Sequence, residues 1–129
     1  MKKRGSFPGL RPESFRFAAE GVWNAIRTEA HMRFHVIAAL AAVLLGAALG
    51  IGPAEWLWVA LAIALVWSAE LVNTAVEHLV DLVSPERQPL AKAAKDTAAG
   101  AVLVAAVFAV VVGCMVFGPR LWALFFSVT

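Results

Sequence analysis

The chain has 129 residues, of which 61% are hydrophobic and only 16% are charged. This composition is typical of an integral membrane protein and excludes an ordinary soluble domain. The formal net charge is only +2, and the single cysteine, Cys114, excludes an intrachain disulfide. We therefore predict one all-α membrane domain over residues 1–129, with a helix at the membrane surface followed by three membrane helices.

The first 31 residues precede any apolar run that could span a bilayer. Residues 1–12 contain several basic residues together with Pro8 and Pro12, and we expect them to be irregular. From residue 13 to about residue 31, apolar and charged side chains mix in the pattern of an amphipathic helix. We expect this helix to lie at the membrane surface, with Trp23 anchored in the headgroup layer.

Three apolar stretches predict membrane helices at about residues 32–50, 54–83 and 90–117, because a spanning helix needs roughly 20 mainly apolar residues. The first is expected to end at the turn that precedes Pro53, and the third at Gly118-Pro119. The second is long enough to continue past the bilayer to about Val83.

Basic residues are distributed unevenly along the chain. Residues 1–33 hold seven, residues 84–96 hold three and the 50–55 turn holds none. Because positively charged connections stay on the cytoplasmic side, we predict that the N-terminus and the 84–96 loop are cytoplasmic. The 50–55 turn and the C-terminus would then lie outside a cell membrane that the chain crosses three times.

Several familiar motifs are absent from the sequence. It lacks the phosphate loop GxxxxGK[ST], the dinucleotide-binding fingerprint GxGxxG and the zinc motif HExxH. His31 and His35 are one helical turn apart and could together contact a metal ion. No third soft ligand is evident, so we favour a role at the membrane surface for both.

Polar side chains form one narrow stripe along the second membrane helix. Steps of three, four and four residues place Glu70, Asn73, Glu77 and Asp81 on one face, because a helix turns about 100° per residue. A helix that has left the membrane, with its acids in water, would explain Asp81. It explains Glu70 poorly, because Glu70 directly follows the apolar run 56–69. Ionisable groups at such positions tend to face a protein interior or a wet cavity, so the stripe predicts a functional site.

Carboxylates together with a nearby lysine, Lys95, suit the transfer of a phosphoryl group. Mg²⁺ binds one or two carboxylates along with substrate phosphates, and a basic side chain can bind phosphate oxygens. A partly desolvated carboxylate can act as a general base. These groups favour transfer from Mg·ATP to a hydroxyl at the membrane surface. The alternative is a small non-enzymatic membrane protein that handles cations or protons, but Lys95-Asp96 and Glu29, expected at the same interface, favour the kinase.

Three motifs around these residues resemble the prokaryotic diacylglycerol kinase/undecaprenol kinase family. They are Glu70-x-x-Asn-Thr-Ala-x-Glu77, Val80-Asp-Leu-Val-Ser-Pro-Glu86 and Ala94-Lys-Asp-x-Ala-Ala-Gly-Ala-Val-Leu-Val104. Thr28-Glu29 and Arg33 are similar to the family's first helix, and the resemblance covers about residues 15–117. It implies an interfacial helix and three membrane helices that assemble as a homotrimer. It also implies active sites that are shared between neighbouring subunits and use Mg·ATP.

The resemblance further implies roles for individual residues. Glu70 matches the general base for the lipid hydroxyl, and Asn73 matches a residue that orients the site. Glu29 and Glu77 match the acids that hold Mg²⁺. The nucleotide-contacting positions are Phe17, Glu86, Arg87, Gln88, Lys95 and Asp96, with Lys95 on phosphate. An N-terminal arginine of the family corresponds to either Arg11 or Arg16.

Three residues bear on the lipid acceptor. Diacylglycerol-specific members tend to have Glu in place of His35 and Gly-Ser in place of Ala98-Ala99. The residues of this chain are similar to the Gram-positive branch, which implies undecaprenol as the preferred acceptor and diacylglycerol as the alternative. Ala99 and, as the matched general base, Glu70 are assigned to acceptor binding, although both branches share the carboxylates and these do not select the acceptor.

Overall fold

The computed structural model describes residues 12–127, in which all regular structure is helical. The helices are α1 (Pro12–Thr28), α2 (Ala30–Leu49), α3 (Pro53–Val83) and α4 (Pro89–Phe126). These bounds lie within two residues of the predicted ones, with two exceptions. The surface helix was predicted to end at about residue 31 and the third membrane helix at about residue 117. Residues 1–12 were predicted to be irregular. Residues 1–11 lie outside the described part of the chain, and Pro12 begins α1.

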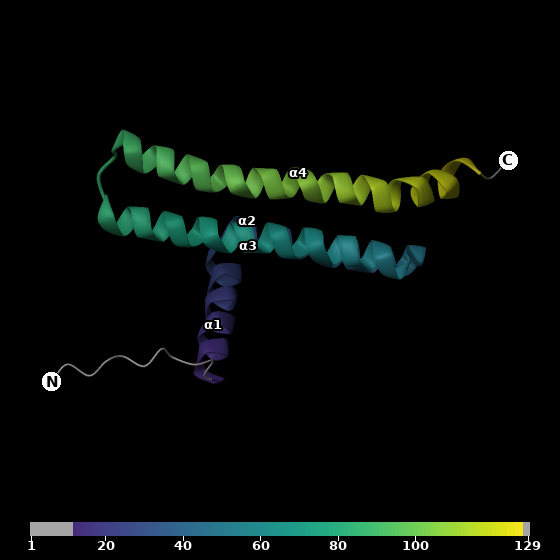
Figure 1. Ribbon diagram of the computed structural model, residues 1–129, viewed down its shortest axis with the longest axis horizontal. Helices are drawn as coiled ribbons and strands as arrows, with labels where there is room; N and C mark the ends of the chain where they lie inside the picture. The colour runs from purple at the N-terminus through teal and green to yellow at the C-terminus, as the bar shows by residue number, and fades with distance from the viewer. Residues whose placement is uncertain (1–11, 128–129) are drawn as a thin grey trace.

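The helices form a narrow bundle from which α1 projects. α3 and α4 run antiparallel beside each other and make the most extensive helix pairing, and α2 packs mainly against α3 (Figure 1). α1 leaves the bundle partway along α3 and runs across the direction of α3 and α4 (Figure 1). The two long helices are joined by the short connection 84–88.

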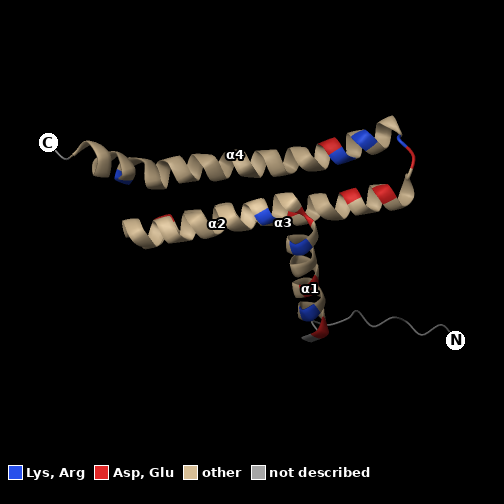
Figure 2. Cartoon of the chain, turned by 180° about the vertical axis from the view of Figure 1, so that it is seen from behind, with Lys and Arg blue, Asp and Glu red and all other residues tan. Residues whose placement is uncertain are grey.

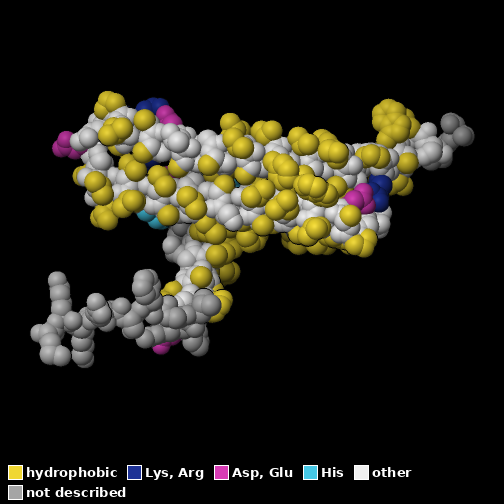
Figure 3. Space-filling view, viewed as in Figure 1, with side chains coloured by type: hydrophobic (Ala, Val, Ile, Leu, Met, Phe, Trp, Pro, Cys, Tyr) yellow, Lys and Arg dark blue, Asp and Glu magenta, His cyan; other side chains and the backbone are white. Residues whose placement is uncertain are grey.

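Three of the helices, α2, α3 and α4, are long and apolar enough to cross a membrane. Figure 2 shows that charged residues gather on α1 and its junction with α2, near the α3–α4 connection, and at the opposite end of α3 and α4. Hydrophobic side chains cover much of the visible surface between the two ends of the bundle (Figure 3). This distribution is that of a multi-pass membrane protein.

α1 ends at Thr28, earlier than predicted, because Glu29 adopts an extended backbone conformation with φ −99° and ψ 121°. The corner is held by hydrogen bonds on both sides. The amide of Arg33 donates to the Glu29 carbonyl at 3.2 Å, and Nη1 of Arg33 donates to the Arg27 carbonyl at 2.9 Å. A single extended residue therefore turns α1 away from α2 and places His31 in α2.

The turn between α2 and α3 depends on two glycines. Gly50 has a φ of 63°, in the left-handed region that favours glycine at a helix end. Gly46 is buried, and a Cβ atom there would lie 2.9 Å from Cη2 of Trp56. Glycine therefore allows the tryptophan ring to pack against the α2 backbone. The buried hydrophobic core next to this turn consists of Ile51, Val59, Ala62, Val112, Val116 and Phe117.

The prediction that the third membrane helix ends at residue 117 was wrong, because α4 continues through Pro119 to Phe126. Proline has no amide proton, so one helical hydrogen bond is missing at this point. The guanidinium of Arg120 supplies other contacts. It donates to the Val116 carbonyl at 3.2 Å and forms an ion pair with Glu55 at the start of α3, where Nη2 donates to Oε2 at 2.7 Å. These contacts attach the final turns of α4 to α3.

Candidate functional site

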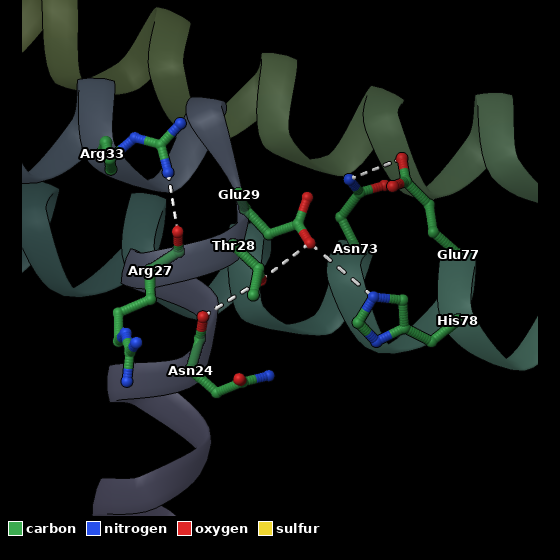
Figure 4. Close-up of polar contacts among 8 residues, drawn as sticks. All are labelled: Asn24, Arg27, Thr28, Glu29, Arg33, Asn73, Glu77 and His78. Carbon is green, nitrogen blue, oxygen red and sulfur yellow. Dashed lines mark hydrogen bonds and ion pairs between the residues drawn. The ribbon is translucent and has the colours of Figure 1, made fainter.

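The polar stripe of α3 passes from a buried environment to an exposed one. Glu70 is 3% exposed, and Asn73 and Thr74 are also buried. Further along the helix, Glu77 is half-buried and Asp81 is exposed. Nδ2 of Asn73 donates to Oε1 of Glu77 at 3.2 Å (Figure 4). A solvated helix face therefore accounts for Asp81 but not for Glu70.

His35 lies beside Glu70, which the sequence analysis did not predict. Its Nε2 atom is 3.9 Å from Oε2 of Glu70, and the two side chains are 14% and 5% exposed. The indole of Trp67 donates to the main-chain carbonyl of His35 at 3.4 Å, which ties α3 to α2 at this level. His31 is exposed, whereas His35 is largely buried against α3. The available signal was that His35 interrupts the otherwise apolar segment 34–49, where a lone polar group needs a partner.

The corner between α1 and α2 faces the polar stripe of α3 (Figure 4). Oε1 of Glu29 lies 3.7 Å from Nε2 of His78 and 3.1 Å from the hydroxyl of Thr28. Because His78 directly follows Glu77 in α3, this contact brings the two expected metal ligands into one region. The Oδ1 atom of Asn73, in the same region, is buried without a hydrogen-bond partner in the described part of the chain.

The donor set in this region suits a magnesium ion that also binds phosphate. Glu29 and Glu77 offer hard oxygen ligands, and within residues 12–127 neither forms an ion pair with lysine or arginine. Mg²⁺ commonly takes one or two carboxylates and completes its shell with substrate phosphates and water. No group of three or more His, Cys, Asp or Glu side chains among the described residues could hold a metal by itself. The residues therefore fit Mg²⁺ delivered with a nucleotide.

A polar hollow of about 630 Å³ opens beside the α3–α4 connection. Five of the six positions expected to contact the nucleotide line it, namely Glu86, Arg87, Gln88, Lys95 and Asp96. Two ion pairs lie among the residues that line it. Lys95 of α4 pairs with Asp81 of α3, and Lys92 pairs with Asp96 within α4. The pairing of Lys95 with Asp81 was not predicted, and it occupies the lysine that was assigned to phosphate.

Other expected site residues do not reach this hollow within a single chain. Phe17 lies on α1 and is 58% exposed, with the guanidinium carbon of Arg16 5.1 Å from its ring centroid. Arg16 also pairs with Glu20 on the exposed side of α1, at 3.3 Å. Ala99 is exposed on α4. Arg11, the other candidate for the N-terminal arginine, lies outside the described residues.

An apolar groove of about 300 Å³ lies among α2, α3 and α4. Alanine, valine and aromatic side chains form most of its walls, and His35 lines it. Because His35 contacts Glu70, the groove extends to the neighbourhood of the buried acid. Its size and apolar walls suit a hydrocarbon chain.

Sequence comparison identifies relatives across nearly the whole helical region. Residues 16–117 match the family described as Prokaryotic diacylglycerol kinase. The undecaprenol kinase of Bacillus subtilis (strain 168) is 45% identical over 109 residues, which cover 84% of this chain and 89% of that protein. A diacylglycerol kinase of Synechocystis sp. is 43% identical over 110 residues, covering 84% of this chain and 63% of that protein. The diacylglycerol kinase of Escherichia coli (strain K12) is 31% identical over 112 residues, covering 84% of this chain and 88% of that protein. Together with the three membrane-length helices, these matches establish that the chain belongs to the prokaryotic diacylglycerol kinase family and is a membrane lipid kinase.

Proposed function

We propose that this lipid kinase transfers the γ-phosphoryl group of ATP to the hydroxyl group of undecaprenol, which yields undecaprenyl phosphate and ADP. The observation that carries the proposal is the buried carboxylate of Glu70, which lies between an apolar groove and the polar hollow at the α3–α4 connection. Membership of a kinase family argues against the alternative of a non-enzymatic protein that handles cations or protons.

Glu70 is proposed as the general base. It accepts the proton of the lipid hydroxyl while the hydroxyl oxygen attacks the γ-phosphorus atom. Glu70 and Glu77 are seven residues apart in α3, which corresponds to about 10 Å along the helix axis. The lipid hydroxyl would therefore approach from the membrane side and the nucleotide from the α3–α4 connection. Asn73 lies between the two acids, and its free Oδ1 can accept a hydrogen bond while its Nδ2 orients Glu77.

Glu29 and Glu77 are proposed to hold Mg²⁺ together with the phosphates of ATP. When bound there, the ion would neutralise negative charge on the phosphates. His78 supports this role because it lies 3.7 Å from Glu29 and directs that carboxylate toward α3.

The polar hollow is proposed as the nucleotide site. Lys95 would leave Asp81 and bind phosphate oxygens, which are stronger competitors for a lysine than one exposed carboxylate. Asp96 and the loop residues Glu86, Arg87 and Gln88 would contact the remainder of the nucleotide, since they line the same hollow.

The working unit is proposed to be a homotrimer with active sites shared between neighbouring subunits. Phe17 and Arg16 or Arg11 are assigned to the nucleotide and Ala99 to the acceptor, yet Phe17, Arg16 and Ala99 do not line the hollow of their own chain. A neighbouring subunit could bring these residues to a site whose acids come from another chain. The resemblance to the family supports this arrangement.

The orientation in a cell membrane is proposed from α1 and from the basic residues. α1 runs across the direction of the membrane-length helices (Figure 1), as a helix lying along the membrane surface would. Its exposed Phe15 and Trp23 suit burial in the headgroup layer. Glu29 at the end of α1 contacts His78, so the part of α3 beyond His78 would protrude into the cytoplasm, where ATP is present.

The acceptor is tested by incubating the purified protein in lipid nanodiscs with Mg·ATP and either undecaprenol or diacylglycerol. Undecaprenol is favoured because the relative named undecaprenol kinase shares more of its residues with this chain than the relatives named diacylglycerol kinase. We expect a higher kcat/KM with undecaprenol. A higher value with diacylglycerol would establish the alternative acceptor, and transfer to neither lipid would refute both.

A further inference from the structure

We propose that Asp81 is a specificity-determining residue of the nucleotide site, which lowers the affinity for ATP and disfavours ATP without Mg²⁺ most strongly. Asp81 lines the polar hollow and forms an ion pair with Lys95, the lysine that is assigned to phosphate. It takes no part in the proposed transfer of the phosphoryl group. The inference rests on the proposed function, because it concerns the nucleotide site beside the α3–α4 connection.

The side chains that line the polar hollow balance one another's charge. Three are acidic and three are basic, namely Asp81, Glu86 and Asp96, and Arg87, Lys92 and Lys95. Both lysines already contact a carboxylate, Lys95 that of Asp81 and Lys92 that of Asp96. A triphosphate that enters the hollow must therefore displace a carboxylate before it can bind Lys95.

The two ion pairs of the hollow are not equivalent. Lys92 and Asp96 are four residues apart on the exposed side of α4, and a single helix brings such residues together. Asp81 belongs to α3 and Lys95 to α4, and only the packing of the two helices joins them. Lys95 can therefore turn toward a phosphate while the carboxylate of Asp81 remains at the wall of the hollow. Asp81 thus acts twice, first as a competitor for the lysine and then as a negative charge near the phosphates.

These two effects depend differently on the charge of the nucleotide. Every form of ATP must displace Asp81 from Lys95, so the competition lowers the affinity for all forms alike. The repulsion grows with the negative charge of the triphosphate, and a bound Mg²⁺ cancels part of that charge. Asp81 therefore repels metal-free ATP more than Mg·ATP, which makes the site selective for the form that carries its metal ion.

A simpler role for the pair is to hold α3 and α4 together, and the chain offers a matched control for it. Glu55 and Arg120 also join α3 to α4, and neither lines the hollow. Figure 2 shows that charged residues of α3 and α4 also lie at the end of the bundle away from their connection. Asp81→Asn and Glu55→Gln therefore each remove an ion pair between the same two helices, but only Asp81 adjoins the nucleotide site.

The experiment measures the equilibrium binding of radiolabelled ATP to the full-length protein in nanodiscs that contain no lipid alcohol, with Mg²⁺ or with EDTA. At low ionic strength we expect Asp81→Asn to bind Mg·ATP about two- to fivefold more tightly, the range expected from the loss of an exposed ion pair. The affinity for metal-free ATP should rise by a larger factor. Both gains should shrink at high salt, which screens exposed charges, and Glu55→Gln should bind both forms as the wild type does.

Three results would overturn the proposal. Unchanged or weaker binding of both forms by Asp81→Asn would show that the carboxylate does not oppose the nucleotide. An equal gain for Mg·ATP and metal-free ATP would remove the selection for the metal-loaded form. An equal gain in Glu55→Gln would mean that a looser contact between α3 and α4, and not the charge at position 81, raises the affinity.

A second variant separates failure of this inference from failure of the proposed nucleotide site. Lys95→Gln should weaken the binding of ATP, and unchanged binding would refute the proposed site itself. If Lys95→Gln weakens binding while Asp81→Asn does not tighten it, only the inference about Asp81 fails. In the double variant the gain in affinity for Mg·ATP should shrink, because no lysine is left to compete for. An undiminished gain would overturn the competition between Asp81 and phosphate for Lys95.

Discussion

Replacing Glu70 with glutamine tests the proposed chemistry most directly, because the side chain keeps its shape and loses its basicity. General acid–base groups typically contribute about 10²–10⁴-fold in rate, so turnover should fall by that factor, equivalent to about 3–5 kcal/mol in the activation free energy. Nucleotide binding should survive. Glu70 does not line the polar hollow, and it lies about 10 Å along the helix axis from Glu77, at roughly 1.5 Å per residue.

The assay measures transfer of labelled phosphate to the lipid, nucleotide binding and oligomeric state on the same purified preparation. Glu55→Gln is the matched control, because it makes the same substitution near the other end of the same helix. Glu55 is paired with Arg120 and lies 15 residues from Glu70, about 22 Å along the axis. We expect this variant to unfold at a lower temperature, because the contact between α3 and α4 is weakened, and to keep its turnover per folded molecule.

Two outcomes would refute this reasoning. Near-normal turnover in Glu70→Gln would mean that Glu70 only forms hydrogen bonds to a neighbouring helix, which glutamine can also do. Joint loss of turnover, nucleotide binding and assembly would indicate that the carboxylate supports the bundle and is not the base.

Three further predictions concern the metal, the topology and the packing of α2. Glu77→Gln should lower activity steeply and raise the Mg²⁺ concentration needed for half-maximal turnover, because one of two hard ligands loses its charge. In a variant without the native cysteine, a cysteine at Arg87 should resist an impermeant thiol reagent in intact cells, and one at Ala54 should react. Gly46→Ala should destabilise the protein by about 1–3 kcal/mol in reversible unfolding, because its Cβ would lie 2.9 Å from a tryptophan ring. The control Gly21→Ala, with no atom within 4 Å of its Cβ, should not destabilise it.

Each of these predictions has a clear opposite. Unchanged activity and Mg²⁺ dependence in Glu77→Gln would remove it from the metal site. The reverse labelling pattern would place Lys95 on the side of the membrane away from ATP and contradict the proposed nucleotide site. Equal stability of the two glycine variants would show that the tryptophan ring moves aside without cost.

Patterns within one segment allowed much of the site to be predicted from the sequence. Apolar length predicted the three membrane helices, and the three- and four-residue spacing placed Glu70 and Asn73 on one face of α3. Both patterns are local, because they depend on the rise and turn of a single helix. The loop residues around Arg87 were instead assigned to the nucleotide from the resemblance to the kinase family.

The tertiary structure decided which helices face one another and where α4 ends. Glu70 meets His35 and Asp81 meets Lys95 across two helices, and no periodicity along one helix specifies such a partner. The end of α4 was mispredicted for the same reason. The local effect of Pro119 predicted that the helix would end there. Arg120 instead reaches across to Glu55, and the helix continues. The sequence thus determined which side chains share a helix face, whereas the packing of α2, α3 and α4 determined which acid is buried beside a histidine and which lysine is held by a carboxylate.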